Sequence, residues 1–165
     1  ANTAALRLYQ KQGFKISRDL LCFQIDRDKY EPAASYKTER IDNIDQTLWT
    51  QLKAFWDVKP SWQNSIDSIN AVQDAFLYSI IHIDGKIAGY GIIEKATGDI
   101  PQLAVDKDYR HRKVASSILA DLIKSTESNK ISILNVDGKY ETAKDFLLKQ
   151  GFQSYVDQYE MILKL

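Results

Sequence analysis

The segment from Gln102 to Ser125 constrains the fold more than any other, because it joins a strand-like stretch to an amphipathic helix through a basic loop. Gln102–Val105 is mostly apolar, and a stripe of apolar residues at helical spacing begins at Val114. The loop between them contains Arg110, His111, Arg112 and Lys113. A helix N-terminus and several cations directed at one point are what a pyrophosphate group requires. A solvated basic turn is the simpler interpretation of the same residues.

The composition narrows the class of protein. The 165 residues, 44% of them hydrophobic, suffice for one core with an appended piece. The chain has 22 Lys plus Arg and 22 Asp plus Glu, so its formal net charge is zero. Without an excess of positive charge, the release of counterions does not favour binding to DNA or RNA, and we expect no nucleic-acid partner. Cys22 is the single cysteine, which excludes an internal disulfide, and no apolar run is long enough to span a membrane. We expect a cytoplasmic protein without a membrane partner.

The hydrophobic pattern predicts a layered α/β fold with the order strand, two helices, three strands, helix, strand, helix and strand. The clearest element is a hairpin around Asp84-Gly85, a dipeptide that favours the turn matching strand twist. The predicted strands are 36–41, 75–83, 86–94, 100–105, 131–136 and 158–165. The predicted helices are 45–56, one capped by Asn64, 113–125 and 142–150. Residues 131–136 are so apolar that we expect a central strand covered on both faces, whereas the last strand alternates as if one face were buried.

A repeated sequence links the two ends of the chain. Residues 11–14 and 149–152 both read Lys-Gln-Gly-Phe, at an offset of 138 residues. Each copy follows a helical pattern and precedes strand-like residues. Residues 1–30 are therefore either the end of a separate repeated unit or native elements of one unusual domain. In both cases their apolar side chains need a partner, so we expect this arm to pack on the rest of the chain or on another copy.

The basic loop resembles the coenzyme A loop of the GNAT family of N-acetyltransferases, whose pattern is Arg or Gln, two residues, Gly, one residue, and Gly or Ala. Arg110 and Ala115 match this pattern, while Lys113 stands at the glycine position. Because residues in the first turn of a helix have ordinary φ angles, we expect Lys113 to weaken ligand binding and not to abolish it. The resemblance implies an α/β fold with a mixed, mostly antiparallel central sheet flanked by helices.

The first copy of the repeat is similar to the signature that closes an acetyltransferase domain in this family, Asn-x-x-Ala-x-x-x-Tyr-x-x-x-Gly-Phe. The matching residues are Asn2, Ala5, Tyr9, Gly13 and Phe14. The resemblance thus identifies a tandem member with a truncated first copy. Residues 1–30 would be the helix–strand end of that copy, and residues 31–165 a GNAT-like acetyltransferase domain. In the second copy Tyr140 and Leu147 replace the Asn and Tyr of the signature, so the tyrosine that often protonates the leaving thiolate is absent.

The resemblance also implies a site for acetyl-CoA along the strand, the loop and the helix. The residues that would bind it are Leu103, Ala104, Val105, Arg110, His111, Arg112, Lys113, Val114, Ala115, Ser116 and Asn135. Backbone N–H groups and basic side chains would hold the pyrophosphate, and the strand would lie along the pantetheine arm. No metal is expected, because His82 and His111 are far apart and lack clustered Cys or carboxylate groups.

Acyl transfer to an amine also needs a base, an acid and support for the oxyanion. The candidate bases are Glu94, Asp99 and Glu160. We select Glu94, although each carboxylate is also compatible with a solvated hairpin or edge position. The candidate acids are Tyr140, Tyr155 and Tyr159. Nothing in the sequence selects among these, and we carry Tyr140 forward with a backbone N–H near Val105 as the oxyanion donor.

Residues 55–65 contain two Trp around a Pro, followed by Gln, Asn and Ser. They would form the acceptor pocket, or the two indoles would simply pack in the core. We expect an acetyl-CoA-dependent N-acetyltransferase in which a primary amine of a small molecule or peptide attacks the thioester directly. The alternative is a non-catalytic, coenzyme A-binding or structural half of a tandem protein. A homodimer through the arm is a further expectation.

Overall fold

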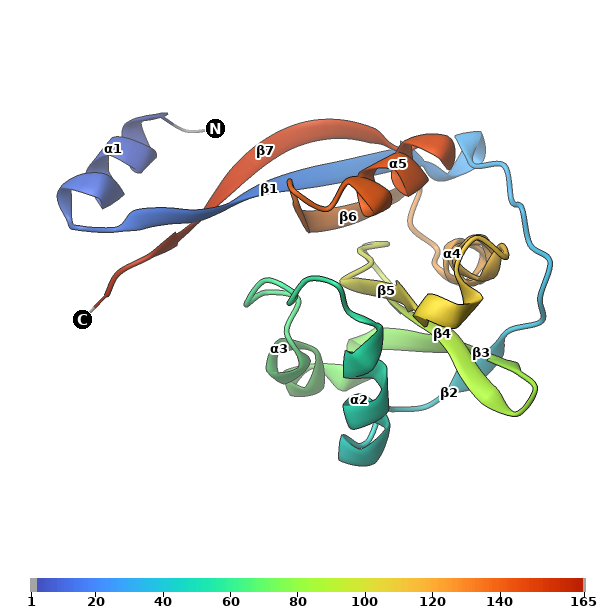
Figure 1. Ribbon diagram of the computed structural model, residues 1–165. Helices are drawn as coiled ribbons and strands as arrows, with labels where there is room; N and C mark the ends of the chain where they lie inside the picture. Colours follow the sequence, from blue (N-terminus) through green and yellow to red (C-terminus); the bar gives the residue numbers. More distant parts are fainter. Residues whose placement is uncertain (1–2, 165) are drawn as a thin grey trace.

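The computed structural model describes residues 3–164, so Asn2 of the closing signature and Leu165 lie outside it. The helices are α1 (Thr3–Lys11), α2 (Gln46–Leu52), α3 (Ile66–Ala71), α4 (Val114–Ser125) and α5 (Glu141–Lys149). The strands are β1 (Lys15–Asp26), β2 (Glu39–Ile41), β3 (Phe76–Ile83), β4 (Lys86–Glu94), β5 (Gln102–Val105), β6 (Lys130–Asp137) and β7 (Gln153–Ile162). Short 3₁₀ turns span Arg27–Lys29, Lys53–Phe55, Gln73–Ala75 and Lys107–Tyr109. Figure 1 shows a body at the right and an arm of α1, β1 and β7 extending to the left.

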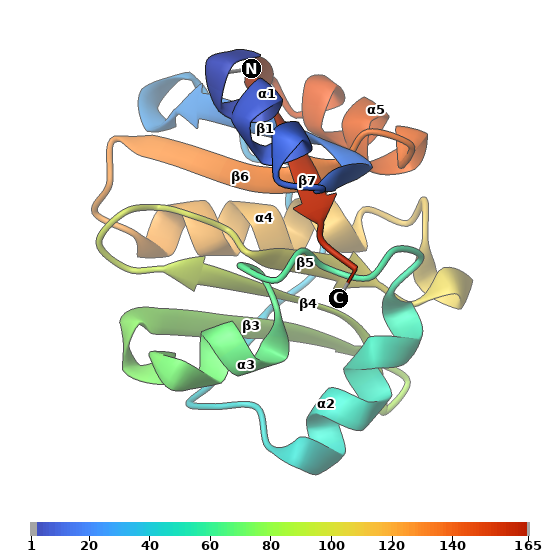
Figure 2. The ribbon, with the colours of Figure 1, turned by 90° about the vertical axis from the view of Figure 1, so that its left-hand side faces the viewer.

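Two antiparallel sheets form the body. One has the strand order β2-β3-β4-β5 and the other β6-β1-β7. They meet at a single parallel bridge between Asp99 and Ser132, where the Ile100 N–H donates to the Ser132 carbonyl at 2.8 Å. Beyond this bridge β5 and β6 follow separate sheets, which Figure 2 shows as upper and lower layers. This arrangement confirms the mixed, mostly antiparallel α/β fold.

Helices cover both faces of the four-stranded sheet. Helix α4 packs on β3 and β4 in a core cluster that includes Ile81, Ile118 and Leu122, all fully buried. A Cβ atom at Gly91 would lie only 2.6 Å from Ile118, so the close approach of α4 to β4 depends on this glycine. On the opposite face a second cluster gathers the buried side chain of Trp49 in α2 and that of Tyr90 in β4. These two layers hold β5 and the start of α4 in place beside the cleft.

Most of the predicted elements are present. The hairpin of β3 and β4 turns at Asp84 and Gly85, with φ angles of 51° and 75°. The first predicted strand is shorter than expected and is limited to β2. The prediction that residues 131–136 form a central strand covered on both faces is wrong. Strand β6 is the outer strand of its sheet and is mostly half-buried, because the sheet that would flank it diverges and leaves a cleft.

The helix starts show which local signals were interpreted correctly. The Asp45 carboxylate caps α2 by accepting from the Leu48 N–H at 2.7 Å. The cap of α3 is Ser65, whose side chain accepts from the Ser68 N–H, and not the predicted Asn64. Asn64 is buried and used elsewhere, in the contacts that cross the cleft. None of the helices in residues 3–164 is long and apolar enough to cross a membrane.

The arm packs on the body through its strand. Strand β1 lies between β6 and β7, which buries Leu20, Cys22 and Phe23 and confirms that part of the expectation. Helix α1 has no buried residue. Strand β7 starts five residues earlier than predicted, and its side chains are mostly exposed, so the prediction of a buried face is wrong. The division of the chain at residue 30 stays a prediction.

Candidate functional site

A cleft opens where β5 and β6 separate. Its walls are formed by Gln102–Ala104 on one side and Ile133–Asp137 on the other. Residues 55–60 and the α5 side chains Ala143, Phe146 and Leu147 complete the lining. The cleft therefore lies between the two sheets, with residues 56–65 passing over it. We call residues 56–65 the cleft loop.

The basic loop ends in a strained backbone at the start of α4. Lys113 is the residue before the helix and has φ 64° and ψ 14°, in the left-handed region, and His111 has φ 58°. The expectation that Lys113 has an ordinary φ is therefore wrong. Residue 113 precedes the first helical turn, and its carbonyl already accepts the Ser117 N–H at 3.0 Å. A left-handed non-Gly residue costs about 1 kcal/mol, which explains why glycine suits this position.

The N-terminus of α4 offers groups for an anion. Within residues 3–164, the backbone N–H groups of Val114, Ala115 and Ser116 donate no hydrogen bond, as the first turn of a helix requires. The side chains of Arg112 and Lys113 are exposed beside them, and Arg112 also stacks over the Tyr109 ring at 5.4 Å. Free amides, a twelve-residue helix and two exposed cations fit the pyrophosphate of coenzyme A.

Arg110 is placed differently from the prediction that it adds charge to this phosphate site. Its Nε donates to the Val105 carbonyl at 3.2 Å, and its Nη2 donates to the Phe55 carbonyl at 3.2 Å. Its Nη1 lies 2.8 Å from the Asp57 carboxylate. The guanidinium is thus held by the protein along the end of β5, where it also occupies the Val105 carbonyl.

Asp57 joins the two sides of the cleft. Its carboxylate pairs with Arg110 on the β5 side and accepts the Tyr140 hydroxyl at 2.5 Å from the β6 side. Burial alone would raise the pKa of Asp57, but the hydrogen bonds from Tyr140 and Arg110 and the nearby charge of Lys107 outweigh it and lower the pKa. Burial and the same carboxylate raise the pKa of Tyr140 to about 12. Asp57 is therefore ionised and Tyr140 protonated at neutral pH.

A chain of hydrogen bonds passes below the cleft loop. The Trp56 indole donates to the Tyr90 hydroxyl at 2.6 Å, which donates to Gln102 Oε1 at 2.7 Å. Gln102 Nε2 in turn donates to the Asn64 carbonyl at 2.7 Å, and Asn64 Nδ2 donates to the Leu134 carbonyl at 2.9 Å. Asn64 consequently connects β5 to β6 across the cleft. Trp56 packs against the core and also lines the cleft, whereas Trp62 is 77% exposed and is not part of the cleft lining. The interpretation that both indoles pack in the core is therefore wrong, and the acceptor pocket stays a prediction.

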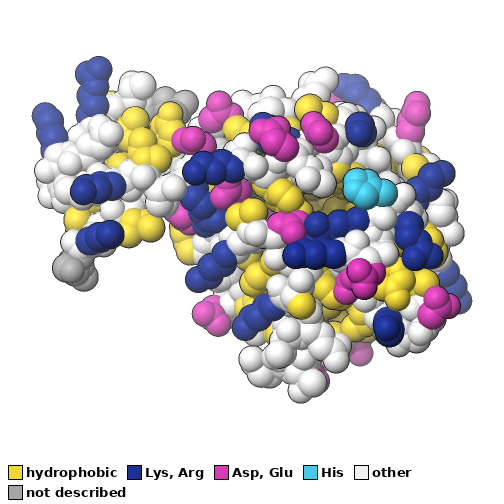
Figure 3. Space-filling model, viewed as in Figure 1, with side chains coloured by type: hydrophobic (Ala, Val, Ile, Leu, Met, Phe, Trp, Pro, Cys, Tyr) yellow, Lys and Arg dark blue, Asp and Glu magenta, His cyan; other side chains and the backbone are white. Residues whose placement is uncertain are grey.

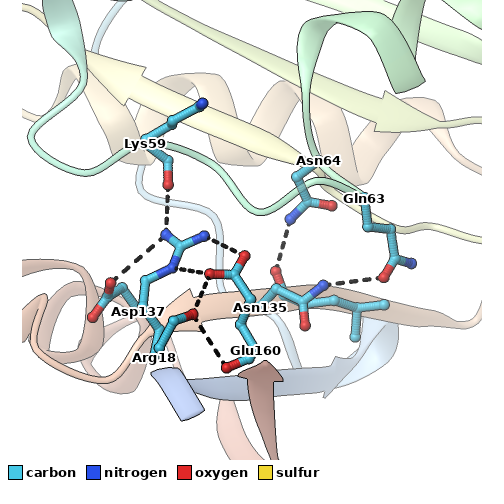
Figure 4. A network of polar contacts seen from close by, with 9 residues as sticks. Arg18, Lys59, Gln63, Asn64, Asn135, Asp137 and Glu160 are labelled. Atoms are coloured by element: carbon cyan, nitrogen blue, oxygen red, sulfur yellow. Dashed lines mark hydrogen bonds and ion pairs between the residues drawn. The ribbon is translucent and has the colours of Figure 1, made fainter. Parts of the chain in front are cut away.

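The arm contributes a side chain to this site, as Figure 4 shows. Arg18 of β1 donates through Nε and Nη2 to the two carboxylate oxygens of Glu160, at 2.8 and 2.7 Å. Its Nη1 donates to the Lys59 carbonyl at 2.7 Å, and Asp137 lies 3.8 Å from the same nitrogen. The hydrogen bond from Arg18, opposed in part by burial, lowers the pKa of Glu160. Arg18 therefore fixes one end of the cleft loop against β7.

The structure brings together only part of the predicted site. Leu103, Ala104, Asn135 and Tyr140 line the cleft. Asn135 has φ 60° in an irregular stretch of β6, and its Nδ2 donates to Gln63 Oε1 at 3.1 Å. Val105 follows the lining residues of β5. Tyr155 and Tyr159 lie on β7 and are 47% and 41% exposed, away from the cleft lining.

The selected base is not in the cleft. Glu94 ends β4, accepts the Thr97 hydroxyl at 2.7 Å and lines a neighbouring hollow that also includes Asp99. Asp99 accepts the Ser132 hydroxyl. Glu160 lies next to the cleft but is paired with Arg18. Among residues 3–164, no group of three or more His, Cys, Asp or Glu is arranged to hold a metal ion.

The sequence did not single out four residues whose side chains shape the candidate site: Arg18, Asp57, Tyr90 and Gln102. Asp57 was inside the predicted acceptor segment, and Gln102 began the predicted donor strand, so polar residues within an apolar pattern were the available signal. Arg18 had no such signal, because its contacts are with residues more than forty positions away.

Comparisons with known proteins agree with this geometry. Residues 34–161 match the family described as acetyltransferase (GNAT) domain. A functionally unknown conserved protein from Staphylococcus epidermidis ATCC 12228 is 18% identical with a TM-score of 0.69, over 98% of this chain and 67% of that one. A GCN5-related N-acetyltransferase from Sphaerobacter thermophilus is 19% identical with a TM-score of 0.64, over 97% and 55%.

A third similar structure is a tandem GNAT protein from the clavulanic acid biosynthesis pathway. It is 12% identical with a TM-score of 0.65, over 98% of this chain and 58% of that one. This chain thus spans between about half and two thirds of the length of these three structures. A search of curated proteins found no match. Because the family match extends over most of its length, the chain belongs to the GNAT family of acetyltransferases.

Proposed function

We propose that the protein is an acetyl-CoA-dependent N-acetyltransferase that acts on a primary amine of a small molecule or peptide. The observation that carries the proposal is the separation of β5 from β6 beside the free amides at the start of α4. The cleft provides a groove for an extended thioester, and the α4 N-terminus favours the negative charge of its pyrophosphate. Family membership supports acyl transfer; the donor and the acceptor are proposals.

The donor would be held by two sets of groups. The backbone amides of Val114–Ser116, with the exposed Arg112 and Lys113, would contact the pyrophosphate. The pantetheine arm would follow Leu103–Val105 toward Asn135. Because the Val105 carbonyl already accepts from Arg110, that guanidinium would have to move before a pantetheine amide could use the same oxygen.

The reaction would be direct attack of the neutral amine on the thioester carbonyl. A C–N bond forms, the C–S bond breaks, and the coenzyme A leaves as a thiolate while the amine loses one proton to solvent. An alkyl thiol with a pKa of roughly 8.5 can leave without a dedicated acid. Tyr140 is the candidate donor of a hydrogen bond to that sulfur, since its raised pKa keeps it protonated. A backbone N–H near Val105 would support the oxyanion.

The carboxylates that line the cleft in residues 3–164 are those of Asp57 and Asp137. The pKa of Asp57 is lowered by its partners, which makes it a weak base. Asp137 accepts the Lys139 N–H at 2.9 Å through Oδ1, and its Oδ2 lies 3.8 Å from Nη1 of Arg18. The carboxylates are better suited to attract a cationic amine than to deprotonate it. We therefore propose that the amine is deprotonated through water.

The alternative, a non-catalytic half that binds coenzyme A or only supports a partner, is favoured by two observations. Leu147 is 3% exposed and fills the position of the family's tyrosine. Arg110 is also engaged by Asp57 and two carbonyls. A single design separates the two functions, because donor binding and thiol release are measured on the same protein.

The test is a thermal melt with and without acetyl-CoA, followed by thiol release across a panel of primary amines. Specific binding raises the melting temperature by mass action. Replacement of Arg112 and Lys113 by Glu should remove the shift, whereas replacement of the exposed Lys124 and Lys130 by Glu, an equal charge change beyond the far end of the first turn of α4, should retain it. A shift without thiol release would favour the non-catalytic half. No shift in the unmodified protein would overturn both the binding of acetyl-CoA and the enzymatic function, and would leave the supporting role alone. With Cys22 as its single cysteine, we propose the cytoplasm as its location.

A further inference from the structure

The sequence repeat is also a structural repeat. After α1 the Gln12, Gly13 and Phe14 amides donate to the last carbonyls of the helix, and after α5 the equivalent amides of residues 150–152 donate to the equivalent carbonyls. Gly13 has φ 90° and Gly151 has φ 88°. The units α1–β1 and α5–β7 therefore have the same local fold at the same offset of 138 residues.

The two units are related by a local two-fold axis. Strands β1 and β7 pair antiparallel, with Lys15 opposite Ile162 and Gln24 opposite Gln153. At an offset of 138, residues 15 and 24 correspond to 153 and 162, so exchanging the two strands reproduces the same pairs. The packing of the glycines agrees independently. A Cβ atom at Gly151 would lie 3.3 Å from Ile25, and one at Gly13 would lie 3.3 Å from Leu163, the equivalent of Ile25.

The surroundings of the two units break this symmetry. In the second unit Leu147 is 3% exposed and Phe152 is 1% exposed, because both pack in the core cluster with α4. In the first unit Tyr9, the equivalent of Leu147, is 49% exposed. Five of the exposed apolar residues of the arm lie on α1 or at the ends of β1 and β7 nearest to it: Leu8, Tyr9, Ile16, Ile162 and Leu163. We call them the arm face; in Figure 3 the arm at the left shows apolar side chains among basic ones.

The edges of the two strands differ in the same way. The edge of β1 that faces away from β7 pairs with β6 over Leu20–Asp26. The equivalent edge of β7, over residues 158–164, has no strand beside it in the part of the chain that is described, since β7 ends the sheet order. An unpaired strand edge next to an apolar face is a site for strand addition.

We propose that the arm face and the free edge of β7 bind a second GNAT-type body, which supplies a strand equivalent to β6 and a helix layer equivalent to α4. The local two-fold axis specifies this partner. When the axis superposes β1 on β7, it places a strand equivalent to β6 at the free edge of β7. It also places a core equivalent to the one around Leu147 against Tyr9. Another copy of this chain is a poor occupant. In that copy, β1 is already paired with β6, so the β6 edge that the β7 strand of the first chain would need is taken. The contact would add one strand to β6-β1-β7 and cover α1.

The test uses the whole chain and a synthetic peptide with the sequence of residues 129–138, which contains β6. Hydrogen exchange is measured by mass spectrometry with and without the peptide at millimolar concentration. Strand addition should slow exchange by about fivefold or more at those 158–164 amides that point to the free edge, because each of them gains a hydrogen bond, whereas the alternate amides already point to β1. The control peptide carries Pro in place of Ile131 and Ile133, which removes two donors and bends the strand, and it should have no effect.

Two outcomes would overturn the proposal. One is unchanged exchange at residues 158–164 with the β6 peptide, or equal protection by the proline peptide. The other is a concentration-dependent doubling of mass in sedimentation of the chain alone, with protection of the same residues, which would assign the face to self-association. Neither measurement depends on acetyl-CoA, so failure here and failure of the proposed activity are distinguishable.

Discussion

Arg18 of β1 and Glu160 of β7 form a two-pronged ion pair, with N–O distances of 2.8 and 2.7 Å. The two residues are neighbours in the β1–β7 register, so the ladder itself places them opposite each other. The remaining guanidinium nitrogen holds the Lys59 carbonyl of the cleft loop. The pair thus connects the arm to the cleft loop. Arg18 lies outside the residues that match the family, yet it helps to shape the cleft.

Replacing Arg18 by Met should destabilise the fold by roughly 1–2 kcal/mol, because charge-assisted hydrogen bonds to partly exposed groups are lost while the apolar stem is kept. The cleft loop should also loosen, visible as faster hydrogen exchange of the Asn64 and Ser65 amides, which donate to carbonyls within the loop. Arg7→Met, an exposed arginine on α1, is the control and should leave both quantities unchanged. Equal unfolding midpoints in urea for Arg18→Met and the parent would contradict this role.

The same pair predicts a pH dependence. The pKa of Glu160 is lowered from its ordinary value of 4.5 in the folded state, chiefly by the hydrogen bond from Arg18. A lowered folded pKa contributes stability that is present above the unfolded pKa and is lost as the pH falls through the folded pKa. Glu160→Gln should therefore be less stable than the parent at pH 6, and the difference should shrink as the pH falls below 4.5. Denaturant melts at several pH values measure this, and a constant difference would exclude the linkage.

Lys113→Gly should stabilise the protein by roughly 0.5–1 kcal/mol. The left-handed φ of 64° is strained for lysine and free for glycine, although glycine gains more entropy in the unfolded chain. Lys124→Gly, the same change in the last turn of α4, should instead cost up to about 1 kcal/mol. Urea unfolding of both variants decides the matter, and a loss of stability in Lys113→Gly would show that the lysine side chain has a compensating contact.

Asp57→Asn should increase affinity for coenzyme A if the proposed donor site is correct. The substitution removes the ion pair of Arg110 and leaves its bonds to the Val105 and Phe55 carbonyls, so the guanidinium can exchange one of these for a charge-assisted bond to phosphate worth about tenfold in Kd. The pKa of Tyr140 should fall from about 12 but stay above 10, because burial is its larger cause. Calorimetry and an absorbance titration measure the two effects. Asp121→Asn, which removes a carboxylate paired with Arg40 outside the cleft, should change neither.

Local patterns predicted most of the fold, because each depended on neighbours in sequence. Asp84-Gly85 set the hairpin turn, and the apolar stripe from Val114 set α4. The burial of β6 and β7 was mispredicted, since alternation of side chains cannot tell which strand ends a sheet or where two sheets diverge. The order β6-β1-β7 places residues from both ends of the chain side by side, a pairing that no local pattern contains.

The parts of the candidate site that depend on the course of the backbone could be predicted from the sequence. The start of α4 offers its free amides where the loop pattern placed them, and Leu103, Ala104 and Asn135 line the cleft. The helix cap predicted at Asn64 was wrong, and the contacts of the Arg110 side chain were not foreseen, because both side chains bond to groups distant in sequence. The φ of Lys113 was also missed, since the position lies one residue before the helix, where a small shift in the boundary changes the backbone region.

Tyr90→Phe should cost about 1–3 kcal/mol, more than its small change in volume suggests. The buried hydroxyl accepts from Trp56 and donates to Gln102, so its removal leaves a donor and an acceptor without their partner beneath the cleft loop. Burial raises the pKa of Tyr90 strongly, which keeps the hydroxyl protonated and the donation intact at all moderate pH values. Tyr78→Phe is the control, because that hydroxyl makes one long contact of 3.3 Å to the Gln73 carbonyl and should cost less than about 1 kcal/mol. Urea unfolding compares the two variants, and equal losses would mean that the Trp56–Tyr90–Gln102 chain does not tie the cleft loop to β5.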